Sequence, residues 1–143
     1  MPVGNGMRLR NACFTINNPP FDENQPDQRQ EPTWCPEKMR YLGYALERGT
    51  SGTVHWQGYV ELRSQITLAS LKVLLGNSPH IESRQGTAQQ ARDYFALPGD
   101  KPGETLQEAK EFGQLSAQGK RSDLAEVVDA VKVNIEFCLL QIP

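Results

Sequence analysis

The sequence predicts an α+β domain with an antiparallel five-stranded central sheet flanked by helices. Segments rich in β-branched and aromatic residues, most clearly Val54–Leu62, indicate strands. The glycine-rich turn at residues 48–53 predicts that this strand folds back on its predecessor as an antiparallel hairpin. Thr67 and Thr87 each precede a segment of helical character and are expected to cap a helix.

The elements are expected in the order β, β, β, α, β, α, β, α. Asn17-Asn18-Pro19-Pro20 ends the first strand, because proline has no N–H to donate to a sheet. The polar residues 21–36 predict a long surface loop with one helical turn near Gln28. Thr87 and Gln90 have the spacing of a capping box. The expected strands are 8–17, 39–47, 54–62, 80–84 and 109–112, and the expected helices are 68–75, 88–96 and 123–133.

Composition excludes several classes of protein. The 143 residues suffice for one domain with a real core, and a content of 38% hydrophobic and 22% charged residues is unlike that of disordered or membrane proteins. The N-terminus has no apolar signal core, and three cysteines without CxxC spacing favour a reducing compartment. The net charge of −2 argues against a general duplex-DNA binder but permits a small site for a few nucleotides.

The strand 54–62 has two different faces, because side chains alternate along a strand. Trp56, Gly58, Val60 and Leu62 form an apolar face that is expected to lie on the core. The other face carries His55, Gln57, Tyr59 and Glu61. Two interpretations explain this pattern. The strand is either amphipathic with a solvated polar face, or its polar face supplies half of a metal site.

The hairpin suggests the other half of that site. Glu47 ends the preceding strand, so its carboxylate is expected to face His55 across the turn. Glu47, His55 and Gln57 would supply oxygen, nitrogen and oxygen ligands, a set that suits Mg²⁺ or Mn²⁺ better than zinc. The alternative is that Glu47 is a solvated hairpin charge.

Tyr94 lies four residues after Gln90 on one face of the helix 88–96. It is either a packing residue or a nucleophile, and a phenol needs a metal or base nearby to attack at neutral pH. At the end of the first strand, Asn17 and Asn18 offer amide groups at a sheet edge or form an Asx-type turn.

Together these segments resemble the HUH endonuclease domain of the rolling-circle replication initiators (Rep) of circular single-stranded DNA viruses. The segments Phe14-Thr15-Ile16-Asn17-Asn18, His55-Trp56-Gln57 and Ala91-Arg92-Asp93-Tyr94 resemble the three family motifs, in order, and Gly119 to Leu124 resembles the segment that follows the nuclease core. The resemblance covers roughly residues 8–130. It implies a ferredoxin-like domain over residues 1–133, with 134–143 as a tail or the start of a linker to a helicase domain. No GxxxxGK[ST] phosphate loop occurs in the sequence.

The resemblance also implies an activity. Tyr94 would be the nucleophile that nicks and rejoins single-stranded DNA at an origin stem-loop through a 5′-phosphotyrosine, with Mn²⁺ or Mg²⁺ held by Glu47, His55 and Gln57. It implies a protein of the host nucleus, with no membrane partner and monomeric as an isolated domain. The candidate DNA contacts are Phe14, Asn17, Asn18, Arg8, Arg10, Arg63, Arg84 and Arg92.

One position departs from the family pattern. Leu97 stands where the third motif usually has a lysine, which leaves Lys101 as a possible substitute. Two alternatives therefore stay open: a single-stranded nucleic-acid-binding module that is non-catalytic or impaired, and a ferredoxin-like RNA-binding domain. The RNA-binding alternative requires exposed aromatic side chains on the sheet, for which Phe14 and Tyr59 are the candidates.

Overall fold

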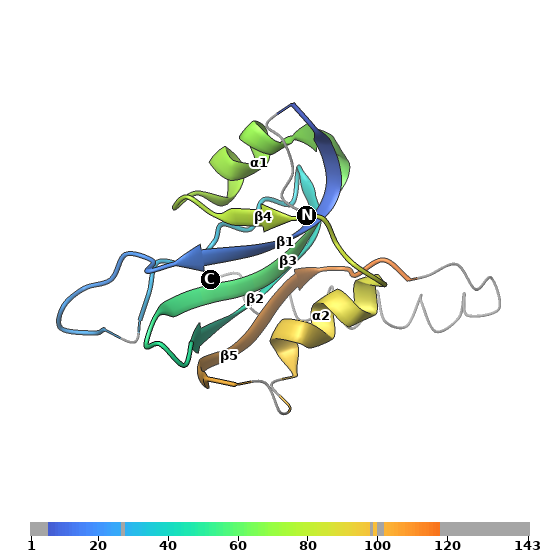
Figure 1. Cartoon of the computed structure of the whole chain (residues 1–143). Helices are drawn as coiled ribbons and strands as arrows, with labels where there is room; N and C mark the ends of the chain where they lie inside the picture. The colour runs from blue at the N-terminus through green and yellow to red at the C-terminus, as the bar shows by residue number, and fades with distance from the viewer. Residues whose placement is uncertain (1–5, 27, 98, 100–101, 118–143) are drawn as a thin grey trace.

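A computed structural model describes residues 6–26, 28–97, 99 and 102–117. These residues form one antiparallel sheet in the order β4-β1-β3-β2-β5, with two α-helices (Figure 1). The predicted α+β class is confirmed. The elements are β1 (Arg8–Asn17), β2 (Met39–Arg48), β3 (Val54–Thr67), α1 (Leu68–Leu75), β4 (His80–Glu82), α2 (Ala88–Ala96) and β5 (Glu104–Gly113).

Strand β3 lies at the centre of the sheet and pairs with β1 and β2. Its apolar face packs in the larger core with α1, whose Leu68, Leu71 and Leu75 are buried. The loop between β1 and β2 covers the same face, and Trp56 Nε1 donates a 2.8 Å hydrogen bond to the carbonyl of Gln30 in this loop. The described residues show no helix near Gln28, but Gln28 N donates to the Gln25 carbonyl (3.0 Å) and closes a single turn there.

Helix α2 covers the opposite face of the sheet (Figure 1). Its capping box is present as predicted, because Thr87 accepts from Gln90 N and the Gln90 side chain accepts from Thr87 N. Phe95 presses its ring against Gly43 so closely that a Cβ at that position would overlap the ring. A glycine on β2 therefore allows α2 to lie directly on the sheet.

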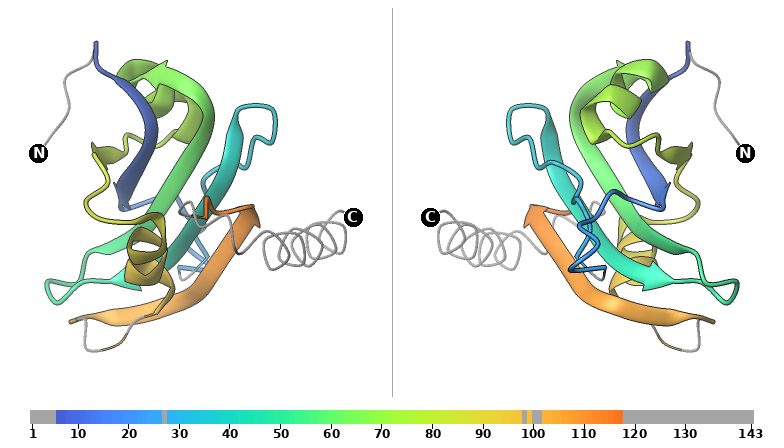
Figure 2. Two further views of the ribbon diagram at one scale, coloured as in Figure 1. Left: turned by 90° about the vertical axis from the view of Figure 1, so that its right-hand side faces the viewer. Right: turned by 90° about the vertical axis from the view of Figure 1, so that its left-hand side faces the viewer.

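Some predicted boundaries were wrong. β5 starts at Glu104 rather than near Ala109, β3 continues to Thr67, and β4 ends at Glu82. The polar face of β3 is not a solvated surface, because Tyr59 packs against α2 and is 0% exposed, and Glu61 is 4% exposed and bonded to Tyr59 and Ser116. Figure 2 shows the strongly twisted sheet from two other directions.

The expected helix 123–133, the proposed boundary at residue 133 and Lys101 lie outside the described residues. Within the described part of the chain, no helix is both long enough and apolar enough to cross a bilayer.

Candidate active site

The hairpin brings Glu47 and His55 together on the α2 side of the sheet. These two residues are directly opposite in the β2–β3 register, and Glu47 Oε1 lies 3.5 Å from His55 Nε2. Their neighbours in the same row are Asn17 on β1 and Thr105 on β5. Because paired residues point to the same side of a sheet, four polar side chains cross this end of the sheet in one row. The Glu47 and His55 side chains are only 11% and 18% exposed.

Gln57 lies one row further along β3, on the same face as His55. Its register partner on β1 is Thr15, and Thr15 Oγ1 donates a 3.2 Å hydrogen bond to Gln57 Oε1. This bond limits the rotation of the carboxamide. Sequence reasoning quoted Thr15 in a motif but gave it no role, because the register that places it beside Gln57 appears only in the folded sheet.

The donor set at this end of the sheet fits Mg²⁺ or Mn²⁺. Two ligands at adjacent corners of an octahedral shell lie about 3 Å apart when each bond is about 2.1 Å, so the 3.5 Å separation of Glu47 and His55 needs only a small adjustment. In the described residues no third His, Cys, Asp or Glu joins them. The carboxamide oxygen of Gln57, one row away on the same face, stays the predicted third ligand.

Tyr94 lies on the last turn of α2, the helix that covers this same face. Its neighbour Phe95 points into the sheet and is 3% exposed, whereas Tyr94 is 58% exposed. Tyr94 is therefore not the packing residue of this helix, and that role belongs to Ala91 and Phe95. Leu97 caps α2 in an extended conformation (φ −114°, ψ 101°) and is 59% exposed.

An ion pair ties α2 to the edge strand β5. Arg92 donates to Glu111 from Nε (2.8 Å) and from one terminal nitrogen (3.0 Å), and the Tyr41 hydroxyl donates to Glu111 Oε1 (2.6 Å). Burial by itself raises the pKa of Glu111, but the bonds from Arg92 and Tyr41 outweigh it and hold that pKa below its ordinary value. Burial, followed by the bond to Glu111, raises the pKa of Tyr41.

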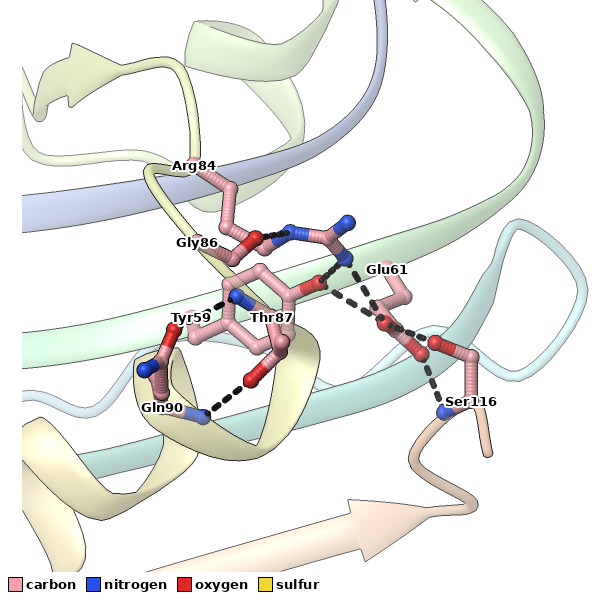
Figure 3. A network of polar contacts seen from close by, with 7 residues as sticks. All are labelled: Tyr59, Glu61, Arg84, Gly86, Thr87, Gln90 and Ser116. Carbon is pink, nitrogen blue, oxygen red and sulfur yellow. Dashed lines mark hydrogen bonds and ion pairs between the residues drawn. The ribbon is translucent and has the colours of Figure 1, made fainter. Parts of the chain in front are cut away.

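A second polar network lies under the start of α2 (Figure 3). The buried Glu61 accepts bonds from the Tyr59 hydroxyl (2.7 Å) and from both Ser116 N (2.8 Å) and Ser116 Oγ (2.6 Å). Arg84 donates to Tyr59 Oη (2.9 Å) and to the carbonyl of Gly86 (3.1 Å). The network joins β3, the loop before α2 and the segment after β5.

The predicted arginine contacts fall into two groups. Arg84 and Arg92 direct donors to groups within the protein, so contact with a phosphate would require those bonds to be exchanged. Arg8, Arg10 and Arg63 are exposed, although Arg63 Nε donates to the Pro36 carbonyl (2.7 Å). Arg8 and Arg10 lie at the start of β1, and Asn17 beside His55 lies at its end. The three exposed arginines stay predicted DNA contacts.

Phe14 does not lie on the surface, and its prediction as a DNA contact is wrong. It is 1% exposed and packs in the larger core, because Gly58 opposite leaves room for its ring. Tyr59 is also buried, so neither aromatic required by the RNA-binding alternative is available for stacking. Asn17 and Asn18 are exposed at the end of β1, where Asn18 adopts a left-handed conformation (φ 51°) and donates to the Val54 carbonyl (2.8 Å).

Comparison with known proteins decides the family. Residues 9–97, more than half of the chain, match the family described as "Putative viral replication protein". The chain belongs to this family. The matched residues of this viral replication protein include the Glu47–His55 hairpin, Gln57 and Tyr94.

Relatives of this viral replication protein occur in several viruses. It is 34% identical over 125 residues to the master replication protein of Subterranean clover stunt virus, a match that covers 87% of the chain and 40% of the relative. It is 35% identical over 120 residues to the replication-associated protein of Pigeon circovirus (84% and 34%) and 41% identical over 83 residues to the master replication protein of Banana bunchy top virus (57% and 24%). The chain thus spans 40% or less of the length of these relatives. Their names support a role in viral replication, and the resemblance to Rep proteins is confirmed at the level of the family.

Proposed function

We propose that the chain is the nuclease domain of a Rep protein that nicks single-stranded DNA at a viral origin and can rejoin it. Tyr94 is the nucleophile, and Glu47, His55 and Gln57 hold Mn²⁺ or Mg²⁺. The substrate is the single-stranded loop of an origin hairpin, and the place of action is the host nucleus.

One observation carries this proposal. The Glu47 carboxylate and the His55 imidazole lie 3.5 Å apart on the face of the sheet that α2 covers, and this helix presents an exposed tyrosine on its last turn. An exposed phenol on the helix that covers the same face as a paired carboxylate and imidazole is an arrangement suited to phosphoryl transfer.

In the proposed reaction, the Tyr94 hydroxyl oxygen attacks the scissile phosphorus. A bond forms between that oxygen and the 5′ phosphate, and the bond from phosphorus to the 3′ oxygen breaks. The proton lost by the phenol is balanced by the proton that the leaving 3′ oxygen gains, so the products are a phosphotyrosine and a free 3′ hydroxyl. The number of phosphodiester bonds is unchanged, so the same hydroxyl can reverse the reaction and close a circle.

The protein groups have distinct tasks. Glu47, His55 and Gln57 would hold the divalent ion, which when bound polarises the phosphate and neutralises developing charge. Thr15 limits the rotation of Gln57 through the 3.2 Å bond. Asn17, in the row of His55, is exposed and offers a carboxamide to a nucleotide at the edge of the site.

The test uses the whole chain and a pool of stem-loop oligonucleotides with randomised loops, labelled at the 3′ end. With Mn²⁺ present, the wild-type protein should acquire the label in a denaturing gel. Tyr94→Phe should acquire none, and His55→Ala should lose at least about 100-fold in adduct rate while keeping a wild-type circular dichroism spectrum. EDTA should stop labelling and excess Mn²⁺ should restore it. Label on Tyr94→Phe, or activity in excess EDTA, would contradict the assignments.

The exposed Leu97 favours a second candidate, a single-stranded DNA-binding module without catalysis, because no cation stands at this position of the last turn. That function predicts DNA binding without metal and without any covalent product. The same gel, together with a binding titration in EDTA, distinguishes the two candidates.

A further inference from the structure

We propose that Arg92, Glu111 and Tyr41 are positioning residues for the cleavage reaction. They fix α2 against β5 and thereby set where Tyr94 stands relative to the Glu47–His55 row. This inference rests on the proposed function, and it gives Arg92 a role other than contact with DNA.

The bidentate pair of Arg92 and Glu111, here called the clamp, lies close to the proposed nucleophile in sequence. Arg92, two residues before Tyr94, reaches Glu111 through two hydrogen bonds of 2.8 and 3.0 Å. A bidentate pair defines orientation as well as distance, because both N–H groups of a planar guanidinium must align with both carboxylate oxygens. The clamp therefore restrains rotation of α2 about its axis, the motion that would swing Tyr94 away from the face.

Tyr41 anchors the other side of the clamp. Its ring is 2% exposed in the smaller core, and its hydroxyl donates to the same Glu111 oxygen that Arg92 Nε contacts. The Glu111 carboxylate thus accepts one bond from Tyr41 on the sheet and two from Arg92 on the helix. Glu111 lies opposite Gly43, on which the Phe95 ring rests, so the clamp and the ring contact restrain α2 in the same row of the sheet.

The geometry favours positioning over phosphate binding for Arg92. Its side chain is 29% exposed, and it also approaches Asp93 at 3.3 Å, so two carboxylates surround the guanidinium. A phosphate would have to compete with both. If Arg92 works only through α2, removing its partner Glu111 must reproduce the defect of removing Arg92 itself.

The experiment measures two quantities for each variant. One is the single-turnover rate of adduct formation at saturating stem-loop oligonucleotide, with Mn²⁺. The other is the Kd for the same oligonucleotide at two salt concentrations. Glu111→Gln and Arg92→Met should each lower the rate about 10- to 100-fold, as expected for a misplaced reacting group, with the Kd unchanged within twofold. The double variant Arg92→Glu with Glu111→Arg should recover at least tenfold over the slower of its two single variants.

Lys110→Met is the matched control. Lys110 directly precedes Glu111 on β5 and makes an ion pair of 2.7 Å with Glu31. Glu31 lies in the loop between β1 and β2 and not on α2. Its loss removes a comparable surface pair from the same strand, so the adduct rate should stay within twofold of wild type.

Amide hydrogen exchange supplies a readout that does not depend on catalysis. Glu111→Gln should speed exchange in α2 while leaving β1 and β3 unchanged, and Lys110→Met should not. Unchanged adduct rates and unchanged α2 exchange would overturn the clamp. A weaker Kd with a smaller salt dependence for Arg92→Met alone would make Arg92 a phosphate contact and also overturn it. If the wild-type protein forms no adduct while α2 exchange responds as expected, the proposed function fails and the structural clamp stands.

Discussion

At the residue scale, three glutamates on one face of the sheet show how environment sets the role of a side chain. Glu47 faces an imidazole, Glu61 accepts from two hydroxyls and a backbone N–H, and Glu111 is held by a guanidinium and a phenol. In the described part of the chain, no buried side-chain nitrogen or oxygen lacks a hydrogen-bond partner. Each of these carboxylates on the α2 side of the sheet therefore has a specific partner.

The Glu111 clamp predicts how stability depends on pH. Its pKa in the folded protein is lowered, so its contribution is complete above the unfolded-state value of about 4.3 and is lost as pH falls through the folded-state value. At pH 7, Glu111→Gln should reduce the free energy of unfolding by about 1 kcal/mol, a value that allows for screening of a side chain that is 35% exposed. Urea titrations should show this difference shrinking below about pH 4. A difference that grows on acidification would contradict the lowered pKa.

Glu108→Gln is the control for this measurement. Glu108 is an exposed carboxylate on the same strand. It should change the free energy of unfolding at pH 7 by less than about 0.5 kcal/mol.

Leu97 gives a second prediction at the residue scale. Leu97 precedes Pro98, which disfavours helical geometry at this position, and the backbone of Leu97 is extended. Because the position is 59% exposed, Leu97→Lys places a cation near Tyr94 without burying it. We expect about a tenfold gain in adduct rate, equivalent to roughly 1.4 kcal/mol of barrier, and no gain for the uncharged Leu97→Met. A slower reaction with lysine would show that another group already supplies the charge.

The sequence predicted which side chains share a face better than it predicted their partners. That Glu47 faces His55, on the same face as Gln57, follows from strand alternation and from the length of one turn. Glu111 and Thr15 could not be predicted, because their roles depend on which strands become neighbours. The burial of Phe14 was not predicted. Alternation along a strand shows which side chains share a face, but it does not show which face the rest of the protein covers.

At the element scale, α2 and β5 depend on each other. The helix rests on β2 through Phe95 and is tied to β5 through Arg92, and β5 is the edge strand next to β2. The N-terminus of α2 was predicted correctly, because its capping residues are adjacent in sequence. The start of β5 was predicted wrongly, because residues 104–108 contain little β-branched or aromatic character. This part of the strand forms by pairing with the exposed edge of β2.

Gly43 is the residue at which this dependence can be tested. In Gly43→Ala the new methyl group would overlap the Phe95 ring and the Tyr41 side chain, so α2 must move off the sheet. We expect a loss of about 1–3 kcal/mol in the free energy of unfolding and a slower adduct reaction. In Gly49→Ala, the nearest atom to the added carbon is 3.8 Å away, so urea titration should detect a change below about 0.5 kcal/mol. Equal effects of the two substitutions would mean that α2 does not need this close contact.

At the scale of the whole molecule, charge limits how the protein can hold DNA. A chain of net charge −2, in which Arg84 and Arg92 are engaged within the fold, has no surplus of positive charge to hold phosphates. Base contacts must then provide much of the discrimination.

This charge balance predicts selective binding with a shallow salt dependence. Each phosphate neutralised on a single strand contributes about −0.7 to the slope of log K against log salt. We expect a slope corresponding to two to four phosphates, and an affinity for a scrambled loop at least about tenfold below that for the preferred loop at 0.15 M salt. Fluorescence anisotropy on both oligonucleotides measures this. Equal affinities would favour the generic binding module.

The contact between Ser116 and Glu61 extends the described fold beyond its last strand. Ser116 supplies two of the hydrogen bonds that a buried carboxylate at the centre of the sheet receives, although it lies beyond the last strand. Any protease product or engineered fragment that stops at Gly113 would keep every strand and helix of the described residues, yet would leave Glu61 buried with two donors fewer. Within the described residues, the folded part of the chain is therefore longer than its secondary structure, and neither a truncation nor a tag should come before Ser116.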